Sequence, residues 1–213
     1  MADTYALELR LTGRKCVIVG GGSVAARKAE TLAKTGAELH VIAPEMDDAI
    51  RTIPGIHCHA ERYHAAVLAG ATLVFACTDD ATVNRQAADD ARAAGAWVNV
   101  ADDPSYCDFF VPACMERGDL RITVSTAGAS PQLAGMIRRR LESSFGPEYA
   151  ILVRQLRDVR SVVRRRIHDP QARRAVFERL CTDDSIALVS SKGPAAWREW
   201  AEKVIEEAAG QQG

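Results

Sequence analysis

A run of apolar residues that ends in three consecutive glycines constrains this chain more than any other feature. Residues 16–19 are rich in β-branched side chains, which favour a strand, and they lead directly into the glycines at 20–22. An alanine-rich segment with helical spacing follows. Gly20, Gly22 and Ala25 then occupy the three positions of the G-x-G-x-x-G/A pattern, which binds dinucleotides between a first strand and a first helix.

Each of these small residues has a physical task in such a turn. Gly20 permits a tight turn at the end of the strand, and Gly22 lets backbone N–H groups approach a pyrophosphate. Ala25 allows the helix to pack closely on the sheet. The diphosphate then lies at the positive end of a helix dipole. Glycines after a strand also form ordinary turns, but this position in the chain favours cofactor binding.

Strand and helix patterns alternate through the first half of the chain. Residues 71–77 are almost all apolar, as in a parallel strand that is covered on both faces. The alternation predicts βαβ units and a parallel sheet with right-handed crossovers, which is a Rossmann-like α/β fold. The expected strands are 15–19, 38–42, 56–59, 71–77 and 97–100, with a short edge strand at 7–11, and the expected helices are 24–35 and 81–94.

The alternation stops in the second half of the chain. Residues 109–113 and 120–126 both favour strands, and no helical pattern separates them. Ser130-Pro131 has the residue types of a helix N-cap and first turn, so a helix is expected at 132–143. A strand pair with one helix buries little apolar surface, so this segment must pack on the Rossmann part or on a second subunit.

The last part of the chain is helical in pattern. Three or four helices are expected after position 148, with one short strand at 186–189. We therefore expect a dinucleotide-binding Rossmann domain at 1–113, a small α+β segment at 114–147 and a helical domain at 148–213; the resemblance described below implies that the first binds NAD and that the second is a dimerisation segment.

Composition limits the classes of partner. The formal net charge of −1 predicts no general affinity for nucleic acid or for membranes. No apolar run approaches the ~20 residues of a membrane span, and no signal-peptide pattern opens the chain, so a cytoplasmic location is expected. The six cysteines show no paired C-x-x-C spacing and are expected to be reduced thiols.

Several short motifs occur in one order along the chain, and this order resembles the siroheme synthase family. That family contains precorrin-2 dehydrogenases, some of which are also sirohydrochlorin ferrochelatases. The resemblance is close over residues 7–145 and looser in the C-terminal helices. The motifs that carry it are Gly20-Gly21-Gly22-x-Val24-Ala25-x-Arg27-Lys28, Gly36-Ala37, Ala43-Pro44-Glu45, Thr78-Asp79-Asp80 with Asn84, Val98-Asn99-Val100-x-Asp102-Asp103, Phe109-x-x-Pro112 and Gly128-x-Ser130-Pro131.

The resemblance implies a reaction and its partners. The reaction is the NAD⁺-dependent oxidation of precorrin-2, a tetrapyrrole, to sirohydrochlorin. In bifunctional members Fe²⁺ is then inserted as a second substrate, which gives siroheme. The resemblance also implies a homodimer formed through the central segment. The rival interpretation from another class is an NAD(H)-sensing regulatory binding protein without catalytic activity.

The expected cofactor site surrounds the carboxyl ends of three strands. An acid that holds the ribose hydroxyls usually ends the second strand, but here Ala43 has that place and Glu45 is the first acid. No arginine stands nearby to hold a 2′-phosphate, which favours NAD over NADP. Asp80 is expected to be a helix cap. The cofactor-binding residues that we predict are Gly20, Gly22, Ser23, Val24, Pro44, Glu45, Thr78 and Asp79.

Asp102 is the predicted catalytic residue. It follows the carboxyl end of the strand expected at 97–100, where the nicotinamide should lie. Dehydrogenation requires a hydride acceptor and a group that takes the proton, and a carboxylate can do the second task. In the resembled family the first Asp of this Asp-Asp pair has that role. The alternative is that Asp102-Asp103 forms a turn or cap before Pro104.

Histidines at 57, 59 and 64 suggest a metal site at first sight. On a strand, His57 and His59 share a face. Their spacing fits no closed zinc pattern, however, and the resembled family has no motif here. We interpret them as polar side chains of a surface strand and expect no metal ligands.

Arginines are concentrated in one stretch. Positions 138–174 hold eleven arginines, no lysine and four acids, a net charge of +7. Guanidinium groups bind carboxylates in a bidentate manner, and precorrin-2 is a polycarboxylate. Part of this basic stretch is therefore a candidate for binding the tetrapyrrole. The alternatives are a solvated helical face or a nucleic-acid patch.

Overall fold

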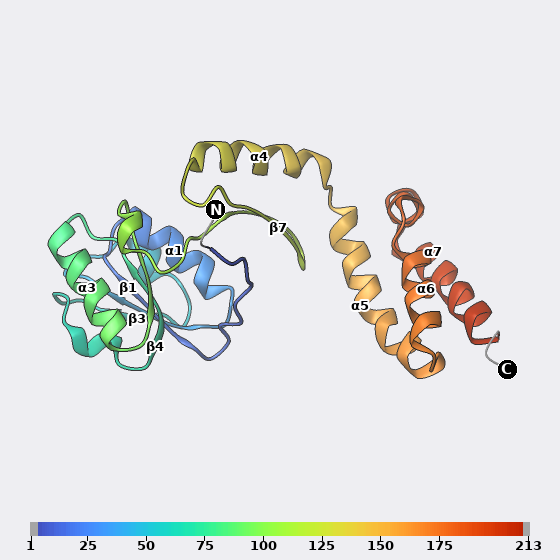
Figure 1. Ribbon diagram of the computed structural model, residues 1–213, viewed down its shortest axis with the longest axis horizontal. Coiled ribbons are helices and arrows are strands. Elements are labelled where there is room, and N and C mark those ends of the chain that lie inside the picture. The colour runs from blue at the N-terminus through green and yellow to red at the C-terminus, as the bar shows by residue number, and fades with distance from the viewer. Residues whose placement is uncertain (1–3, 211–213) are drawn as a thin grey trace. The chain divides into compact units, whose positions relative to one another are not determined.

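The structure is a computed structural model of the chain and describes residues 4–210. These residues form two compact units, of which the first ends at Val111 and the second begins at Pro112. Figure 1 draws the first unit in blue to green and the second in yellow-green to red. The further division of the second unit at 147 stays a prediction.

The first unit is built on a parallel sheet. Its strand order over the described residues is β3-β2-β1-β4-β5, which follows the first five strands of the Rossmann order 3-2-1-4-5-6. The order reverses between β1 and β4, and ligands bind outside the carboxyl ends of the strands at such a switch point. The predicted Rossmann-like class is confirmed. The strands are β1 (Lys15–Val19), β2 (Glu38–Ile42), β3 (His57–His59), β4 (Ala71–Ala76) and β5 (Trp97–Val100).

Both faces of this sheet are covered by apolar layers. Cys16 and Ile18 of β1 pack in a layer with helix α1 (Ser23–Ala33), whereas Val17 and Val19 pack in a layer with helix α3 (Ala81–Ala93). All four side chains are fully buried, as expected for an apolar run in a central parallel strand. Short helical turns complete the unit: α2 (Asp48–Arg51), η1 (Ala65–Leu68) and η2 (Pro104–Tyr106).

The second unit contains a hairpin and a group of helices. Strands β6 (Ala113–Arg117) and β7 (Leu120–Val124) pair in an antiparallel manner. The helices are α4 (Pro131–Ser144), α5 (Glu148–Arg166), α6 (Pro170–Leu180) and α7 (Asp183–Gly210). Within residues 4–210 none of the helices combines the length and the hydropathy that crossing a bilayer requires.

The last three helices enclose one core around Trp197. Its side chain is fully buried, and its Nε1–H donates to Ser185 Oγ at 2.9 Å. Helix α7 is interrupted at Gly193, where φ is +80° and Pro194 follows. The prediction of three or four helices after position 148 is confirmed.

Three strand predictions are wrong. Residues 7–11 form no strand, and of their apolar side chains only Leu11 is buried. The strand expected at 109–113 begins only at Ala113, because Phe109 is held by side-chain contacts to Asn99 and Phe75 rather than by a ladder. The segment 186–189 belongs to α7, and its burial follows the helical spacing of Ser185 and Val189.

Candidate functional site

A cavity of about 690 Å³ opens at the carboxyl edge of the sheet. Its lining comes from the segments that follow β1, β2 and β4, which are the strands at the switch point. Its volume is in the range of small-molecule and cofactor sites. All eight predicted cofactor-binding residues line it: Gly20, Gly22, Ser23, Val24, Pro44, Glu45, Thr78 and Asp79.

The glycines of the turn differ in what surrounds them. Gly20 has φ of +125°, and a Cβ atom there would lie 2.5 Å from the carbonyl oxygen of Cys77. A Cβ on Gly21 would overlap the carbonyl of Glu45. Gly22 has an ordinary φ of −83°, and a Cβ there would meet no atom within 4 Å. The fold therefore requires glycine at 20 and 21, whereas at 22 the missing side chain leaves open space beside the cavity.

The first turn of α1 offers backbone donors to that space. Gly22 is the N-cap and supplies no side-chain hydrogen bond, and no acid stands in the first turn. The first N–H groups of a helix have no intrahelical partner and attract anions. Ala25, one turn further, is fully buried against the sheet, which lets the helix approach closely. This arrangement fits the diphosphate of a dinucleotide.

Three acids line the cavity beyond the glycine turn: Glu45, Asp47 and Asp79. Asp47 caps helix α2 by accepting a hydrogen bond from the Ala49 N–H at 2.9 Å. Among the described residues no lysine or arginine lines the cavity. Carboxylates can accept hydrogen bonds from ribose hydroxyls, but they repel a 2′-phosphate, so the lining suits NAD better than NADP.

The loop after β4 is held by a buried amide. Asn84 accepts a hydrogen bond from the Thr78 N–H at 2.9 Å, and its Nδ2 donates to the Thr78 carbonyl at 2.9 Å. Asp80 caps α3 as expected, because it accepts from the N–H groups of Thr82 and Val83. Asn84 thus fixes the backbone of Thr78 at the rim of the cavity.

The sequence interpretation missed several lining residues: Gly21, Ala43, Met46, Asp47 and Cys77. Each is a neighbour in sequence of a predicted residue, so extending each motif by one or two positions would have found it. Burial raises the pKa of the Cys77 thiol to about 11. Cys77 therefore stays protonated near neutral pH and is an apolar wall rather than a nucleophile.

Asp102 lies at the same edge of the sheet, after β5. The Ala101 N–H donates to the Ala76 carbonyl at 2.8 Å, so the chain leaves β5 beside the end of β4. Asp102 has φ of +61°, and its side chain is exposed. Within residues 4–210 its carboxylate has no hydrogen bond or ion pair, and it is not part of the cavity lining. The structure thus brings together the eight predicted cofactor-binding residues and leaves Asp102 at the neighbouring strand end.

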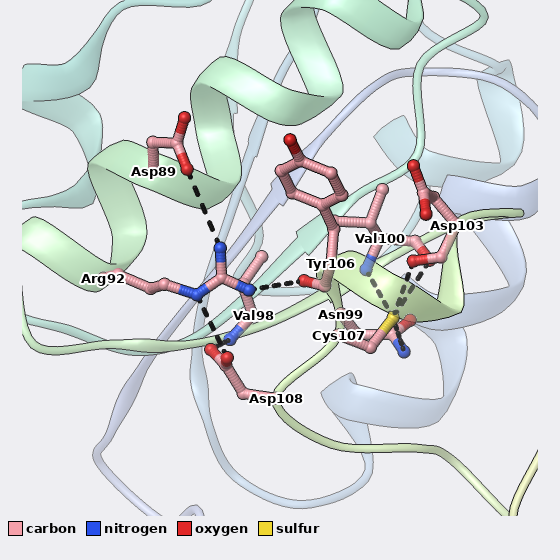
Figure 2. A network of polar contacts seen from close by, with 9 residues as sticks. All are labelled: Asp89, Arg92, Val98, Asn99, Val100, Asp103, Tyr106, Cys107 and Asp108. Atoms are coloured by element: carbon pink, nitrogen blue, oxygen red, sulfur yellow. Dashed lines mark hydrogen bonds and ion pairs between the residues drawn. The ribbon is translucent and has the colours of Figure 1, made fainter.

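A polar network fixes the loop that carries Asp102 (Figure 2). Asp108 accepts a hydrogen bond from the Val98 N–H at 2.9 Å and pairs with Arg92 Nε at 3.1 Å. Arg92 Nη2 also donates to the Tyr106 carbonyl at 2.8 Å, and the Val100 N–H lies 3.2 Å from Cys107 Sγ. The loop is therefore tied to β5 through Asp108 and Cys107 and to α3 through Arg92.

The neighbouring acid, Asp103, has a different environment from Asp102. Its carboxylate accepts a hydrogen bond from Ser105 Oγ at 2.6 Å and lies 3.8 Å from Arg85 Nη2. Asp103 therefore stabilises the turn before Pro104. This structural role is the alternative that the sequence offered for both Asp102 and Asp103. Asp102 has no such structural task.

A half-buried lysine lies beneath the same edge. Lys28 Nζ donates to Asn99 Oδ1 at 3.2 Å and lies 4.7 Å from the centre of the Phe75 ring. Burial lowers the pKa of this amine below its usual value. Asn99 in turn donates to the Phe109 carbonyl at 3.0 Å. Lys28 and Asn99 stood in the quoted motifs without an assigned role, and the structure shows them linking α1, β5 and the loop end.

Many of the arginines of the second unit have partners. Arg138 pairs with Glu142, Arg166 with Glu202, and Arg157 with Asp119 at 2.5 Å. Among the described residues, no ion pair involves the following arginines of that stretch: Arg139, Arg140, Arg154, Arg160, Arg164, Arg165 and Arg173.

The sheet order, the glycine turn and the cavity at the switch point define a dinucleotide-binding protein of the Rossmann type. Residues 7–113 match the family described as "Putative NAD(P)-binding". Residues 117–144 match the family described as "Sirohaem biosynthesis protein central". The chain belongs to the siroheme synthase N-terminal-type family.

Similar curated proteins carry the name siroheme synthase. That of Methylococcus capsulatus is 38% identical over 210 residues, which are 97% of this chain and 44% of the relative. That of Nitrosomonas eutropha is 36% identical over 182 residues, which are 84% of this chain and 38% of the relative. The chain spans less than half the length of these relatives.

A solved structure named "SirC, precorrin-2 dehydrogenase" has a similar fold. Its TM-score is 0.75 at 23% sequence identity, and the match covers 94% of this chain and all of that chain. This likeness supports the fold of both units.

Proposed function

We propose that this chain oxidises precorrin-2 to sirohydrochlorin with NAD⁺. One observation carries the proposal: the eight predicted cofactor residues line one cavity, at the sheet edge where Asp102 has an exposed carboxylate without a partner in the described chain. The names of the relatives and of the similar structure support the choice of substrate.

In this proposal the turn at Gly22 and the first N–H groups of α1 hold the cofactor diphosphate. Glu45 accepts hydrogen bonds from the ribose, and Thr78 and Asp79 close the site from the β4 side. NAD⁺ supplies the hydride acceptor when bound. The acids in the lining make NAD the preferred cofactor over NADP.

The oxidation removes a hydride and a proton from the macrocycle, and Asp102 accepts the proton at its carboxylate. An exposed carboxylate at the end of a parallel strand is accessible to a large substrate. Asp103 holds the loop in place during this step through Ser105. The same Asp102 carboxylate would accept pyrrole protons if Fe²⁺ is inserted as a second substrate.

The experiment that tests this proposal compares Asp102 with a surface acid on helix α3. Asp102→Asn should lower kcat by about 100-fold or more and leave the Kd for NAD⁺ within about twofold. Asp89→Asn, which changes an exposed acid near Arg92, is the matched surface control and should keep full activity. Oxidation is followed by visible absorbance, and NAD⁺ binding by calorimetry. A fully active Asp102→Asn variant would remove this residue from the mechanism.

The same assay separates the enzyme from a sensor. Tight NADH binding with no spectral change of precorrin-2 would favour an NAD(H)-sensing protein. A second assay, with sirohydrochlorin and Fe²⁺ or Co²⁺, decides whether the chain also has chelatase activity. If the parent chain forms the metal complex and the Asp102→Asn variant does not, this result would support one carboxylate for both reactions.

The proposal includes a homodimer formed through the central segment and a cytoplasmic location. Helix α4 buries only Ala134 among its own residues, and Leu133 on the same helix is 44% exposed. Leu133 is therefore the apolar position of α4 at which a partner surface can be tested. Light scattering of the chain and of Leu133→Arg tests this point, since the substitution should shift a dimer toward monomer.

The arginines without ion pairs are proposed to bind the tetrapyrrole carboxylates. Replacing Arg139, Arg140 and Arg154 together by Gln should raise the KM for precorrin-2 with little change in NAD⁺ affinity, because guanidinium groups bind carboxylates strongly. An unchanged KM would show that these arginines belong to a solvated face.

A further inference from the structure

One part of the sheet lacks a helical cover. Side chains alternate along β2, and Ile42 packs in the layer with α3, so Glu38 and His40 point to that same face. The crossover from β3 to β4 contains η1 and, over the described residues 60–70, no longer helix. Polar side chains therefore occupy the face of β2 and β3 where a Rossmann crossover helix would otherwise lie.

Three potential ligands converge on this uncovered face. The parallel register places His40 beside His57, and their rings stack with centroids 4.5 Å apart. His40 Nε2 lies 3.0 Å from Glu38 Oε1. One ligand atom from each of Glu38, His40 and His57 lies within 4.8 Å of the others. The sequence interpretation considered His57 and His59 but not Glu38 and His40, which come from another strand.

A second layer of contacts orients the central histidine. His40 Nδ1 lies 3.0 Å from His59 Nε2, and His59 Nδ1 lies 3.9 Å from Glu61 Oε1. When His40 Nδ1–H donates to His59 and His59 Nδ1–H turns to Glu61, the Nε2 lone pair of His40 is free to bind a cation beside Glu38. Carboxylates and histidines in such chains fix the tautomer of histidine ligands.

The histidine network has two tautomeric arrangements that hold the same number of protons. In the other tautomer, His59 Nε2–H donates to His40 Nδ1 and His40 Nε2–H donates to Glu38. A shift of one proton within each ring converts one arrangement into the other.

We propose that Glu38, His40 and His57 form a binding site for a divalent transition metal of the Zn²⁺ type. Two imidazoles and one carboxylate are a ligand set that suits such ions, with a fourth position open to water or to an external ligand. Glu38 and His57 are exposed, so their side chains can rotate toward the ion that His40 anchors. None of the three residues lines the cofactor cavity.

The experiment titrates the full, reduced chain with CoCl₂ and follows the visible absorption of the bound ion, with ZnCl₂ as competitor. We expect one Co²⁺ per chain, bound through nitrogen and oxygen, and displaced by Zn²⁺. His57→Gln and His40→Gln should each weaken binding at least about tenfold. The matched control is His64→Gln, because His64 pairs with Glu61 at 3.4 Å but lies outside the ligand set. Its affinity should stay within about twofold of the parent.

Three results would overturn the proposal. The first is an unchanged affinity in His57→Gln, which decides alone if the less exposed His40→Gln fails to fold. The second is an intense thiolate-to-cobalt band, because it would assign the ion to some of the free cysteines instead. The third is the absence of saturable Co²⁺ binding to the parent chain.

Discussion

Replacing Gly22 by alanine should weaken cofactor binding without destabilising the fold. The φ of −83° is allowed for any residue, and the added Cβ would meet no protein atom within 4 Å. Alanine is a poorer N-cap than glycine by about 0.5–1 kcal/mol, whereas restricting the unfolded chain returns about 0.4–1 kcal/mol. The two effects nearly cancel, so the free energy of unfolding should change by less than about 0.5 kcal/mol.

The same Cβ would project into the space where the diphosphate approaches the N–H groups of α1. We expect the Kd for NAD⁺ to rise at least tenfold, which is about 1.4 kcal/mol. Calorimetry measures the affinity, and denaturant unfolding without cofactor measures the stability.

Gly20→Ala is the matched comparison. Its φ of +125° disfavours any L-residue, and its Cβ would lie 2.5 Å from a backbone oxygen. Strain of this kind costs about 1–3 kcal/mol before the overlap is added, so this variant should lose stability first. If Gly22→Ala binds NAD⁺ as tightly as the parent chain, the assignment of the diphosphate to this turn is wrong.

Three other substitutions test the structure around the site and the second core. Asn84→Ala should weaken NAD⁺ binding several-fold and cost about 1–3 kcal/mol of stability, because the Thr78 backbone loses both partners; unchanged binding would contradict the clamp. Trp197→Ala should destabilise the second unit by about 3–5 kcal/mol in thermal unfolding, since the side chain is fully buried. Lys28→Met should remove part of the pH dependence of the free energy of unfolding. The folded pKa of Lys28 is lowered, so between that pKa and the ordinary value of 10.5 the unfolded chain binds more protons than the folded chain. The stability of the parent chain therefore rises with pH over that range. Parallel stability curves for parent and variant over that range would refute it.

Much of the first unit could be predicted from the sequence because local and long-range signals agree there. The apolar run at β1, the alanines of α1 and Gly36 each favour the element that forms. The strand at 186–189 was mispredicted for the opposite reason. Its β-branched and apolar residues favour a strand locally, but burial of Ser185 and Val189 on one helix face against Trp197 decides the outcome. That packing joins residues on the two sides of the interruption at Gly193, and the local pattern of residues 186–189 does not reveal it.

The candidate sites could also be predicted only in part from the sequence. The eight residues that the motifs predict to bind the cofactor line one cavity, because each follows a strand whose carboxyl end is fixed by the parallel topology. The link between His40 and His57 depends on strand register, which spacing along one strand does not give. The short crossover between β3 and β4 also had to be known before that face could be recognised as uncovered.

The contacts also distinguish nearby residues of the same type that look equivalent in the sequence. Gly20 is required by its φ and by the Cys77 carbonyl, whereas Gly22 is free of both constraints. Asp103 is tied to Ser105, whereas Asp102 has no partner in the described chain. In each pair one residue maintains the backbone and the other is left free beside the same sheet edge. Binding at Gly22 and catalysis at Asp102 therefore stay predictions, and the Gly22→Ala and Asp102→Asn variants test them directly because neither residue is needed for a contact within the described chain.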